Sequence, residues 1–429
     1  MAPTHMPHPS SRTASQSSTS TLAQRYATVR AHTLALAAPL TPEDCVVQSM
    51  PDASPVKWHL AHTTWFFETF VLAPNRPDYR AFDTSFKVLF NSYYNAIGDR
   101  HPRPQRGLLT RPSLNAVRAY RAHVDDAMQA LLTHAHGADA LIELGLHHEQ
   151  QHQELVVTDT KHLFSCNPAK PAYLPAWPLT PVVARRRGWV SHPGGVTEIG
   201  ATGVGFAFDN ETPRHRVLLH PYDLATHPVS HGEFAAFIED GGYRRPELWL
   251  SLGWDMVVAQ GWQAPLYWER RDGAWWTFTL RGMAQIDEGA PMTHLSLFEA
   301  DAYARWAGAR LPTEFEWEAL AGDVAVEGNF VESGALHPLA LREPTPHGQL
   351  AQLWGDVWEW TQSSYAPYPG FRAAGGAIGE YNGKFMCNQY VLRGGSCATP
   401  RSHIRASYRN FFPPDARWQF SGLRLARDG

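Results

Sequence analysis

The sequence predicts an α+β protein in which a four-helix bundle is followed by a loop-rich mixed α/β domain. Residues 21–164 contain four long segments whose apolar residues recur at three- and four-residue steps, the spacing of amphipathic helices. Residues 165–188 contain five prolines and interrupt this periodicity. Of the 16 tryptophans, 13 follow residue 188, together with many glycines and short strand-like runs, a composition typical of a mixed domain.

These shifts in composition define the expected domain boundaries. Residues 1–20 are rich in Ser, Thr and Pro without apolar periodicity, and we expect a disordered tail there. We expect the bundle over residues 21–170, a linker over 171–188 and the mixed domain over 189–429.

The composition narrows the class of protein. With 44% hydrophobic and 18% charged residues, the 429-residue chain has material for sizeable cores. The formal net charge of -4 and the absence of any run of five Lys or Arg disfavour a nucleic-acid partner. Because no apolar stretch approaches about 18 residues and no secretory leader pattern opens the chain, we expect a cytoplasmic protein without a membrane partner. The four cysteines lack CxxC spacing and are expected as reduced thiols.

Four segments carry the helical pattern of the bundle. They are residues 21–40, 54–72, 113–134 and 138–164. The second segment is expected to begin with Ser54 as the N-cap and Pro55 in the first turn. The connection between the second and third segments is long for a compact domain, which indicates a functional loop.

In the mixed domain we expect only one or two clear helices. The clearest covers residues 296–308, where Ser296 and Glu299 have the spacing of a capping box.

The stretch from Leu146 to Leu155, LHHEQQHQEL, is too polar for an ordinary core segment. His148 and His152 are four residues apart, so a helix places both on one face, toward the bundle. Two buried imidazoles need hydrogen bonds or a shared metal ion, because an unpaired buried polar group is costly. The alternative is a polar surface patch or two hydrogen-bonded core histidines.

The second helical segment favours the metal. Within WHLAHTTWFFETF, His62 has Trp58, Trp65 and Phe66 on its face, as an inward-facing residue would. His59 lies about 60° to one side at 3.6 residues per turn. His62 is therefore the expected third ligand, joining His148 and His152 from a second helix.

His148 to His152 also reads as H-E-x-x-H, the zinc-peptidase signature. The longer form of that signature needs Gly and His where Leu155 and Thr158 stand. The form with a downstream glutamate also fails, because the next glutamate after Glu154 is Glu198. A zinc-dependent hydrolase therefore remains only a remote alternative.

Three neutral imidazoles would leave open positions on a divalent ion for O2 and a thiol. In the long connection, Tyr93 and Tyr94 could bring a phenol near the metal as a proton or hydrogen-bond donor, although adjacent tyrosines also occur in ordinary loop packing. Arg103 and Arg106 could bind a substrate carboxylate, although such a pair is often only a solvated basic loop.

These motifs resemble a known family. HLAHTTWFFE, FNSYYNAIG with RHPRPQRGLL, and HHEQQHQEL are similar to the DinB-like bundle of the ergothioneine-biosynthetic sulfoxide synthases. In the second half, ETPRHRVLLHPYDLATHPVSHGEFAAFIEDGGY, DAYARWAGARLPTEFEWEAL, WGDVWEWT and VLRGGS resemble the formylglycine-generating-enzyme domain, a C-type-lectin-like fold. The resemblance covers residues 21–429.

The resemblance implies a non-heme iron(II) enzyme that uses O2. Such enzymes couple the sulfur of cysteine or gamma-glutamylcysteine to the imidazole of hercynine, which is trimethylhistidine, and oxidise the sulfur to a sulfoxide. The positions that match the family's functional residues are His62, His148 and His152 for iron, Gln151 for the substrate imidazole, Arg103 and Arg106 for the thiol substrate's carboxylate, and Asn410 for the hercynine side of the pocket.

Two departures bear on the thiol and on the proton donor. Branches that use gamma-glutamylcysteine resemble NWDxPxR, with an Asp and an Arg that hold the glutamyl group. This chain has Phe412 and Ala416 at those positions, so Phe412 is expected to contact a smaller substrate, free cysteine. The resemblance to the cysteine-using branch implies Tyr94 as the proton donor, with Tyr93 supporting it.

Several related functions stay open. An ovothiol-type synthase would use histidine itself, and a selenoneine-type synthase would use a seleno-sugar. A thiol-binding bundle protein without catalysis would consume no O2. Formylglycine-generating activity is disfavoured, since Cys387 and Cys397 do not match that enzyme's active-site pair.

Overall fold

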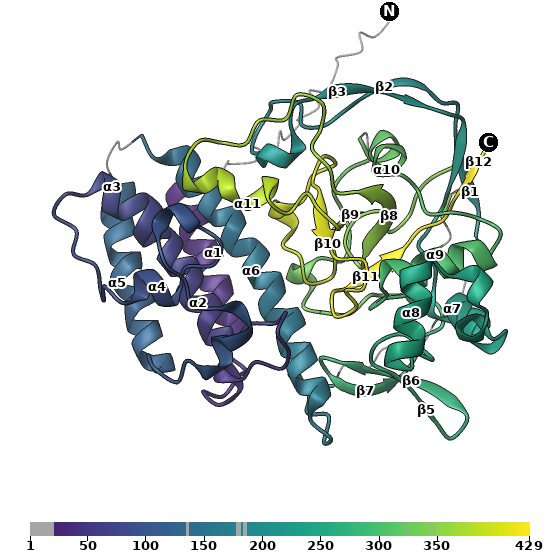
Figure 1. Cartoon of the computed structure of the whole chain (residues 1–429), viewed down its shortest axis with the longest axis horizontal. Helices are drawn as coiled ribbons and strands as arrows, with labels where there is room; N and C mark the ends of the chain where they lie inside the picture. Colours follow the sequence, from purple (N-terminus) through teal and green to yellow (C-terminus); the bar gives the residue numbers. More distant parts are fainter. Residues whose placement is uncertain are drawn as a thin grey trace, which may run out of the picture.

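The computed structural model describes most of the chain. The described residues are 21–133, 137–176, 182, 187–322, 324–343, 345–346 and 348–429. The expected tail of residues 1–20 and part of the expected linker of residues 171–188 lie outside these ranges. The N-terminal part is helical and the C-terminal part combines short sheets with helices, as the sequence predicts (Figure 1).

The four predicted bundle helices are confirmed. They are α1 (Leu22–Ala37), α2 (Val56–Phe66), α5 (Leu114–Leu132) and α6 (Asp139–Cys166). Thr21 caps α1 through a capping box and Ser113 caps α5. The expected N-cap of α2 is wrong, because Pro55 occupies that position and Ser54 is drawn into tertiary hydrogen bonds instead.

A close approach of α2 and α6 brings their histidines together. Gly145 lies one turn before His148, and a Cβ atom there would lie 2.6 Å from Cε1 of Phe67. Any larger residue there would clash with the rings of Phe66 and Phe67. The α2 helix continues as a π-helix over Phe67–Leu72, a rare conformation that is frequent at functional sites.

The long connection between α2 and α5 folds against both domains. It contains the short helices α3 (Ala73–Asn75) and α4 (Phe86–Leu89) and a 3-10 segment over Arg103–Leu108. From the C-terminal domain, the Glu380 carboxylate accepts hydrogen bonds from the backbone N–H groups of Asn95 and Ala96, each at 2.9 Å. These bonds fasten the connection to the second domain.

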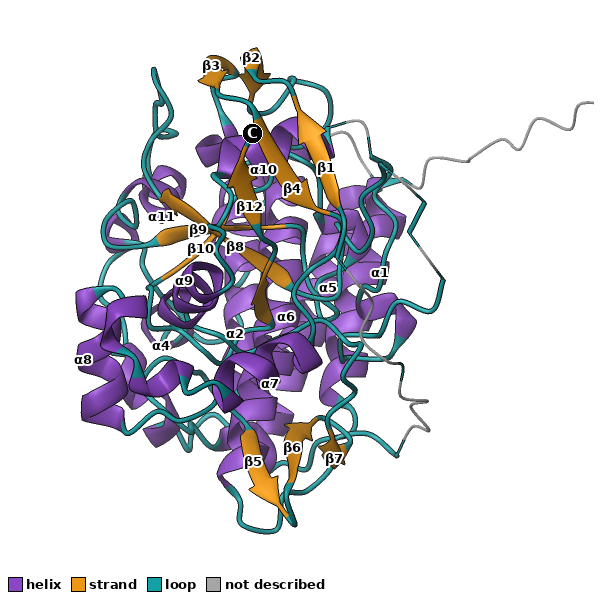
Figure 2. Cartoon of the chain, turned by 90° about the vertical axis from the view of Figure 1, so that its right-hand side faces the viewer, coloured by secondary structure: helices purple, strands orange, loops and turns teal. Residues whose placement is uncertain are grey.

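The C-terminal domain contains four small sheets among its described residues. Their strand orders are β1-β4-β12, β10-β9-β8-β11, β2-β3 and β5-β6-β7, and all pairings are antiparallel except that of β11 with β8. The strands are β1 (Trp189–His192), β2 (Gly195–Ile199), β3 (His215–Leu219), β4 (Tyr222–Ala225), β5 (Trp268–Arg271), β6 (Ala274–Thr279), β7 (Gly282–Gln285), β8 (Trp358–Ser364), β9 (Tyr390–Arg393), β10 (Asn410–Phe412), β11 (Ser421–Leu423) and β12 (Ala426–Asp428). In Figure 2 the β1-β4-β12 and β5-β6-β7 sheets lie at opposite ends of this domain.

The helices of this domain are more numerous than the sequence predicts. They are α7 (His231–Glu239), α8 (Ser251–Gln260), α9 (Leu297–Trp306), α10 (Glu314–Ala321) and the single turn α11 (Glu380–Gly383). The predicted capping box of Ser296 and Glu299 at the start of α9 is confirmed. The expectation of one or two helices is wrong because α7, α8 and α10 are only eight to ten residues long, too short to show a clear period.

Helix α6 lies between the two domains (Figure 1). It packs on α1 and α2 in the bundle, and its His147 and Gln150 contact His403 and Ser402 of the C-terminal domain. Most of its polar residues are therefore buried although they occupy several sides of the helix. In the part of the chain that the structure describes, no helix has the length and apolar character needed to cross a membrane.

Candidate metal centre and substrate cavity

Three histidines from two helices meet at one point. His62 of α2 and His148 and His152 of α6 each offer a ring nitrogen, and these atoms lie within 4.8 Å of one another. Nε2 of His62 lies 3.2 Å from Nε2 of His148. Two ligand atoms about 2.1 Å from a shared ion are about 3.0–3.4 Å apart, so the distance between His62 and His148 fits a shared metal ion. The predicted convergence of the three side chains is confirmed.

All three imidazoles are held in their neutral, metal-binding form. Burial lowers the pKa of His148 to about 4. Burial, and then the neighbouring His148, lower the pKa values of His62 and His152 far below the ordinary value. Nδ1 of His62 donates a hydrogen bond to the Phe90 carbonyl at 2.6 Å, so its Nε2 keeps a free lone pair.

Aromatic rings fix the orientation of His62. Its imidazole is stacked between Trp58 and Trp65, with ring centroids 4.5 Å and 5.6 Å away. On the other face of Trp58 lies the Arg106 guanidinium, whose central carbon is 3.3 Å from a ring centroid of the tryptophan. A candidate metal ligand and a candidate carboxylate-binding side chain therefore stack on the same indole.

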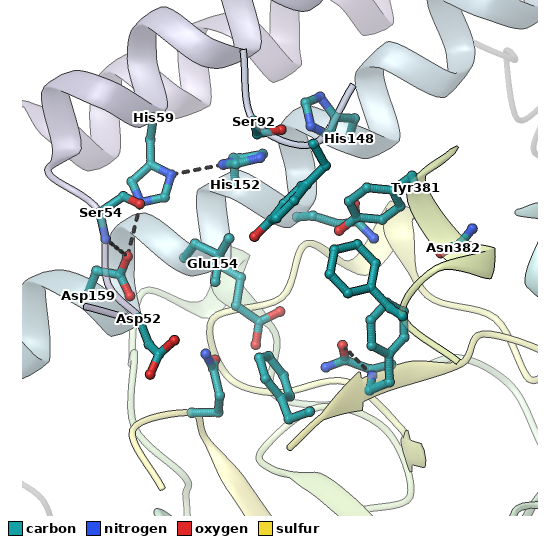
Figure 3. Close-up of a pocket in the computed structure, with 18 of the residues that line it drawn as sticks. Asp52, Ser54, His59, Ser92, His148, His152, Glu154, Asp159, Tyr381 and Asn382 are labelled. Atoms are coloured by element: carbon teal, nitrogen blue, oxygen red, sulfur yellow. Dashed lines mark hydrogen bonds and ion pairs between the residues drawn. The ribbon is translucent and has the colours of Figure 1, made fainter. Parts of the chain in front are cut away.

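The histidines line a cavity of about 200 Å³ between the two domains (Figure 3). Nine of the ten site residues predicted from the sequence line it: His62, Tyr93, Arg103, Arg106, His148, Gln151, His152, Asn410 and Phe412. The tenth, Tyr94, does not.

The two adjacent tyrosines differ in their surroundings. Tyr94 is buried against Trp65 and Phe70, with ring centroids 5.6 Å and 5.1 Å away, and burial raises its pKa well above the ordinary value. Tyr93 lines the cavity, where its hydroxyl accepts a hydrogen bond of 3.1 Å from Nη1 of Arg103. A guanidinium can only donate, so the Tyr93 proton is free to be donated elsewhere. The geometry therefore favours Tyr93, not Tyr94, as the phenol that meets the substrate.

Arg103 and Arg106 give the cavity a cationic side. Arg106 is buried, and its Nη1 donates to Oγ of Ser54 at 2.9 Å. Burial lowers its pKa, and among the described residues no carboxylate forms an ion pair with either arginine. Nε of both side chains is buried without a hydrogen-bond partner in the described chain. A buried guanidinium without a counter-charge is costly, so the pair is suited to a bound anion.

The opposite wall offers hydrogen-bond groups. Nε2 of Gln151 donates to the Tyr408 hydroxyl at 2.9 Å, which leaves Oε1 of Gln151 as an acceptor. Tyr408 in turn contacts Nε2 of His403 at 3.0 Å. Oδ1 of Asn410 accepts from the Phe411 backbone, so its amide N–H groups stay available.

His59 and Glu154 are two of the cavity residues that the sequence did not predict. His59 lines the cavity beside His152, although its helical position pointed to one side. Glu154 is buried there, and its carboxylate accepts hydrogen bonds from Ser396, Thr399 and Trp358 at 2.6, 2.7 and 2.8 Å. No sequence signal identifies Glu154, because its partners are more than 200 residues away.

Glu149, the glutamate of the H-E-x-x-H string, faces away from the histidines. It is fully buried in the bundle, where its two carboxylate oxygens accept from Arg30 at 2.8 Å and from Arg121 at 2.9 Å. These charges lower its pKa to about 2 despite its burial. A zinc peptidase needs this glutamate as a general base at the metal, so the structure speaks against the hydrolase alternative.

Comparison with known proteins identifies both halves of the chain. Residues 25–156 match the DinB superfamily and residues 180–429 match the sulfatase-modifying factor enzyme 1-like domain. The hercynine oxygenase of Mycolicibacterium thermoresistibile is 34% identical over 415 residues, which are 88% of each chain. The hercynine oxygenase of Mycobacterium tuberculosis is 33% identical over 439 residues, 95% of this chain and 98% of the relative. Among solved structures, PvdO from Pseudomonas aeruginosa matches 56% of this chain and 94% of its own with a TM-score of 0.39 and 19% identity.

The matches extend over both domains in the order that the sequence motifs indicate. The histidine centre lies in the half that matches the DinB superfamily, and the cavity is closed by the half that matches the sulfatase-modifying factor domain. This protein is therefore an oxidoreductase of the hercynine oxygenase family.

Proposed function

We propose that this enzyme is an iron(II)- and O2-dependent sulfoxide synthase of ergothioneine biosynthesis that acts on cysteine and hercynine. The cysteine thiol and the imidazole C–H of hercynine each lose a hydrogen, and a C–S bond forms. One oxygen atom of O2 oxidises the sulfur and the other leaves as water, so the product is hercynylcysteine sulfoxide. The observation that carries the proposal is the meeting of His62, His148 and His152 in a cavity closed by both domains.

Iron suits the three-histidine group. Among the described residues the group has three neutral imidazoles and neither thiolate nor carboxylate, a donor set that imidazole-binding iron accepts. Bound iron(II) would supply the activation of O2 and the binding of the thiol sulfur. The protein's part is to hold His62 and His152 through their second ring nitrogens and to shield the centre from bulk water.

The arginine pair is the proposed site for the carboxylate of the thiol substrate. Arg106 is buried and Arg103 is half-buried, and neither guanidinium has an acidic partner in the described chain. A carboxylate bound there would supply the missing counter-charge and would offset the cost of removing the guanidinium groups from water. The stacking of Arg106 on Trp58, which also stacks on His62, would keep the thiol near the metal.

Free cysteine is the proposed thiol. Phe412 lines the cavity and its ring packs edge-to-face on Trp418, while Ala416 is buried and short. Neither side chain could bind the charged glutamyl group of gamma-glutamylcysteine, and burying that group without partners would be costly.

Hercynine fits the remaining wall. Oε1 of Gln151 could accept the imidazole N–H, and the amide of Asn410 could donate to the hercynine carboxylate. The Glu154 carboxylate, held by neutral donors alone, is available to attract the trimethylammonium group, together with the faces of nearby aromatic rings. A cation there would also offset the burial that raises the pKa of Glu154.

Tyr93 is the proposed proton donor. Its oxygen accepts from Arg103, so its own hydrogen can be directed toward the substrates.

The decisive assay is anaerobic reconstitution with iron(II), hercynine and either cysteine or gamma-glutamylcysteine, followed by O2 and mass analysis. We expect sulfoxide chiefly with cysteine. Turnover with the dipeptide alone would refute the choice of thiol, and replacement of hercynine by histidine distinguishes an ovothiol-type synthase. A protein that consumes no O2 with any of these pairs would refute the proposed reaction.

A further inference from the structure

His59 has a hydrogen-bond partner at both ring nitrogens. It lies beside the three-histidine group without belonging to it. It is buried on α2, one turn before His62. Its Nδ1 lies 2.8 Å from Nδ1 of His152, and its Nε2 lies 3.1 Å from Oδ2 of Asp159 (Figure 3). A chain of hydrogen bonds thus runs from Asp159 through His59 to His152.

Asp159 determines which atom donates and which accepts in each hydrogen bond of this chain. Oδ2 of Asp159 also accepts from the Ser54 backbone N–H at 2.8 Å, so this oxygen acts as an acceptor. Nε2 of His59 must then donate to it. A neutral imidazole carries one N–H, so Nδ1 of His59 is left to accept the proton of Nδ1 of His152.

This arrangement decides which nitrogen of His152 can bind a metal. With its proton on Nδ1, His152 has its lone pair on Nε2, at the other edge of the ring. His62 is set the same way, since its Nδ1 donates to the Phe90 carbonyl at 2.6 Å. His148 differs, because its Nδ1 is buried without a hydrogen-bond partner in the described chain. The centre therefore depends on its other two imidazoles for preorganisation.

We infer that His59 is a positioning residue: with Asp159 behind it, it fixes the tautomer and ring orientation of His152 so that Nε2 of His152 is presented to the metal. The inference rests on the metal site of the proposed function, but not on the thiol or on the reaction. Partners of this kind hold a ligating histidine in place, and their loss costs about 10- to 100-fold in metal affinity.

Two substitutions of His59 test its two ring nitrogens separately: one retains the acceptor at Nδ1 and the other retains the donor at Nε2. The amide of His59→Asn reaches the position of Nδ1 and can still accept from His152, whereas that of His59→Gln reaches the position of Nε2 and contacts only Asp159. We would titrate the metal-free full-length variants with Co(II) and record its visible absorption. We expect His59→Gln to weaken Co(II) binding about 10- to 100-fold and to shift the absorption band. We expect His59→Asn to stay within about threefold of the wild type, since the bond to His152 is retained.

Equal affinity and equal spectra for His59→Gln and the wild type would overturn the role of His59. Equal losses in both variants would also overturn it, because they would indicate a general structural role. A wild-type protein that binds no Co(II) would instead refute the metal site itself.

A measurement on the wild type covers the case in which a variant fails to fold. Histidine-selective ¹⁵N NMR of the Zn(II)-loaded protein should show His152 bound through Nε2 with its proton on Nδ1. Binding of His152 through Nδ1 would overturn the inference.

Discussion

Two sides of helix α6, one facing the bundle core and one facing the cavity, use buried polar residues in opposite ways. On the core side, Glu149 has both oxygens paired with the guanidinium groups of Arg30 and Arg121. On the cavity side, burial keeps His148 and His152 neutral, and Arg106, which lines the same cavity, has no acidic partner among the described residues.

The difference separates polar residues that hold the fold from those that bind. Paired charges are costly to separate, so the core side resists change. The cavity side carries a histidine nitrogen and guanidinium N–H groups without hydrogen-bond partners in the described chain, and such groups are suited to ligand binding. Neighbouring residues of one helix, His148 and Glu149, should therefore fail in different ways when substituted.

The largest effect is expected for His148→Ala. Removal of one of three ligands should lower sulfoxide formation by about 1000-fold or more, with loss of bound metal. Stability of the metal-free protein should fall less than in a core-side variant, because Nδ1 of His148 has no hydrogen-bond partner in the described chain. Metal content and product formation are the measurements. The matched control is His147→Ala, one residue away and facing His403, which should retain metal; equal metal loss in both would contradict the assignment.

Next in size is Glu149→Gln, which removes the shared counter-charge of two buried arginines. We expect a loss of about 3–5 kcal/mol in stability, visible as a lower midpoint of chemical unfolding. The fraction that remains folded should still turn over hercynine and cysteine. Unchanged stability with abolished turnover would contradict this structural role and make Glu149 catalytic.

Acid should weaken the two sides in different pH windows. The folded-state pKa of His148 is about 4, below the ordinary value of 6.5, so the unfolded chain takes up a proton first and stability falls as pH drops from 6.5 to 4. Glu149 has a folded-state pKa of about 2 against 4.5, so its stabilisation is lost between pH 4.5 and 2. Each change is worth about 3 kcal/mol.

Thermal unfolding of the metal-free protein across this pH range checks the two windows. His148→Gln should make the loss of stability in the upper window shallower, while other buried histidines with lowered pKa values, such as His62 and His152, still contribute there; the lower window should stay unchanged. Parallel curves for this variant and the wild type would contradict the link.

The smallest effect separates the two tyrosines. Tyr93→Phe should shift the ratio of sulfoxide to cysteine sulfinic acid by about 10-fold or more, because it removes the phenol that lines the cavity. Tyr94→Phe should leave the ratio unchanged, since Tyr94 packs against Trp65 and Phe70. Mass analysis of both products measures the ratio, and the reverse result would return the donor role to Tyr94.

The helical bundle and its histidines could be predicted from the sequence because both depend on local periodicity. Apolar spacing located α1, α2, α5 and α6, and the aromatic neighbours of His62 identified its inward face. The same periodicity correctly preferred His62 to His59 as the third member of the group. It could not predict the contact of His59 with His152, because that contact depends on how α2 and α6 pack together.

The C-terminal wall of the cavity was less predictable, because its residues come from loops and short strands. Tyr408 and Ser396 reach the cavity region only through contacts with α6 that span about 240 residues or more. Local rules also failed at Ser54, whose side chain accepts from Arg106 instead of capping α2. In each case tertiary contacts outweighed local preference.

The third side of α6 faces the C-terminal domain and limits which domains of related enzymes can be joined to this bundle. Glu154 relies on donors from Ser396 and Thr399, and Lys161, whose pKa burial lowers to about 7, donates to His294 at 2.6 Å. A chimera that joins this bundle to the C-terminal domain of a relative would leave the Glu154 carboxylate and the Lys161 amine buried between the domains without their hydrogen-bond partners. Exchange of domains between homologues should therefore succeed only when the new C-terminal domain provides the same hydrogen-bond partners for α6.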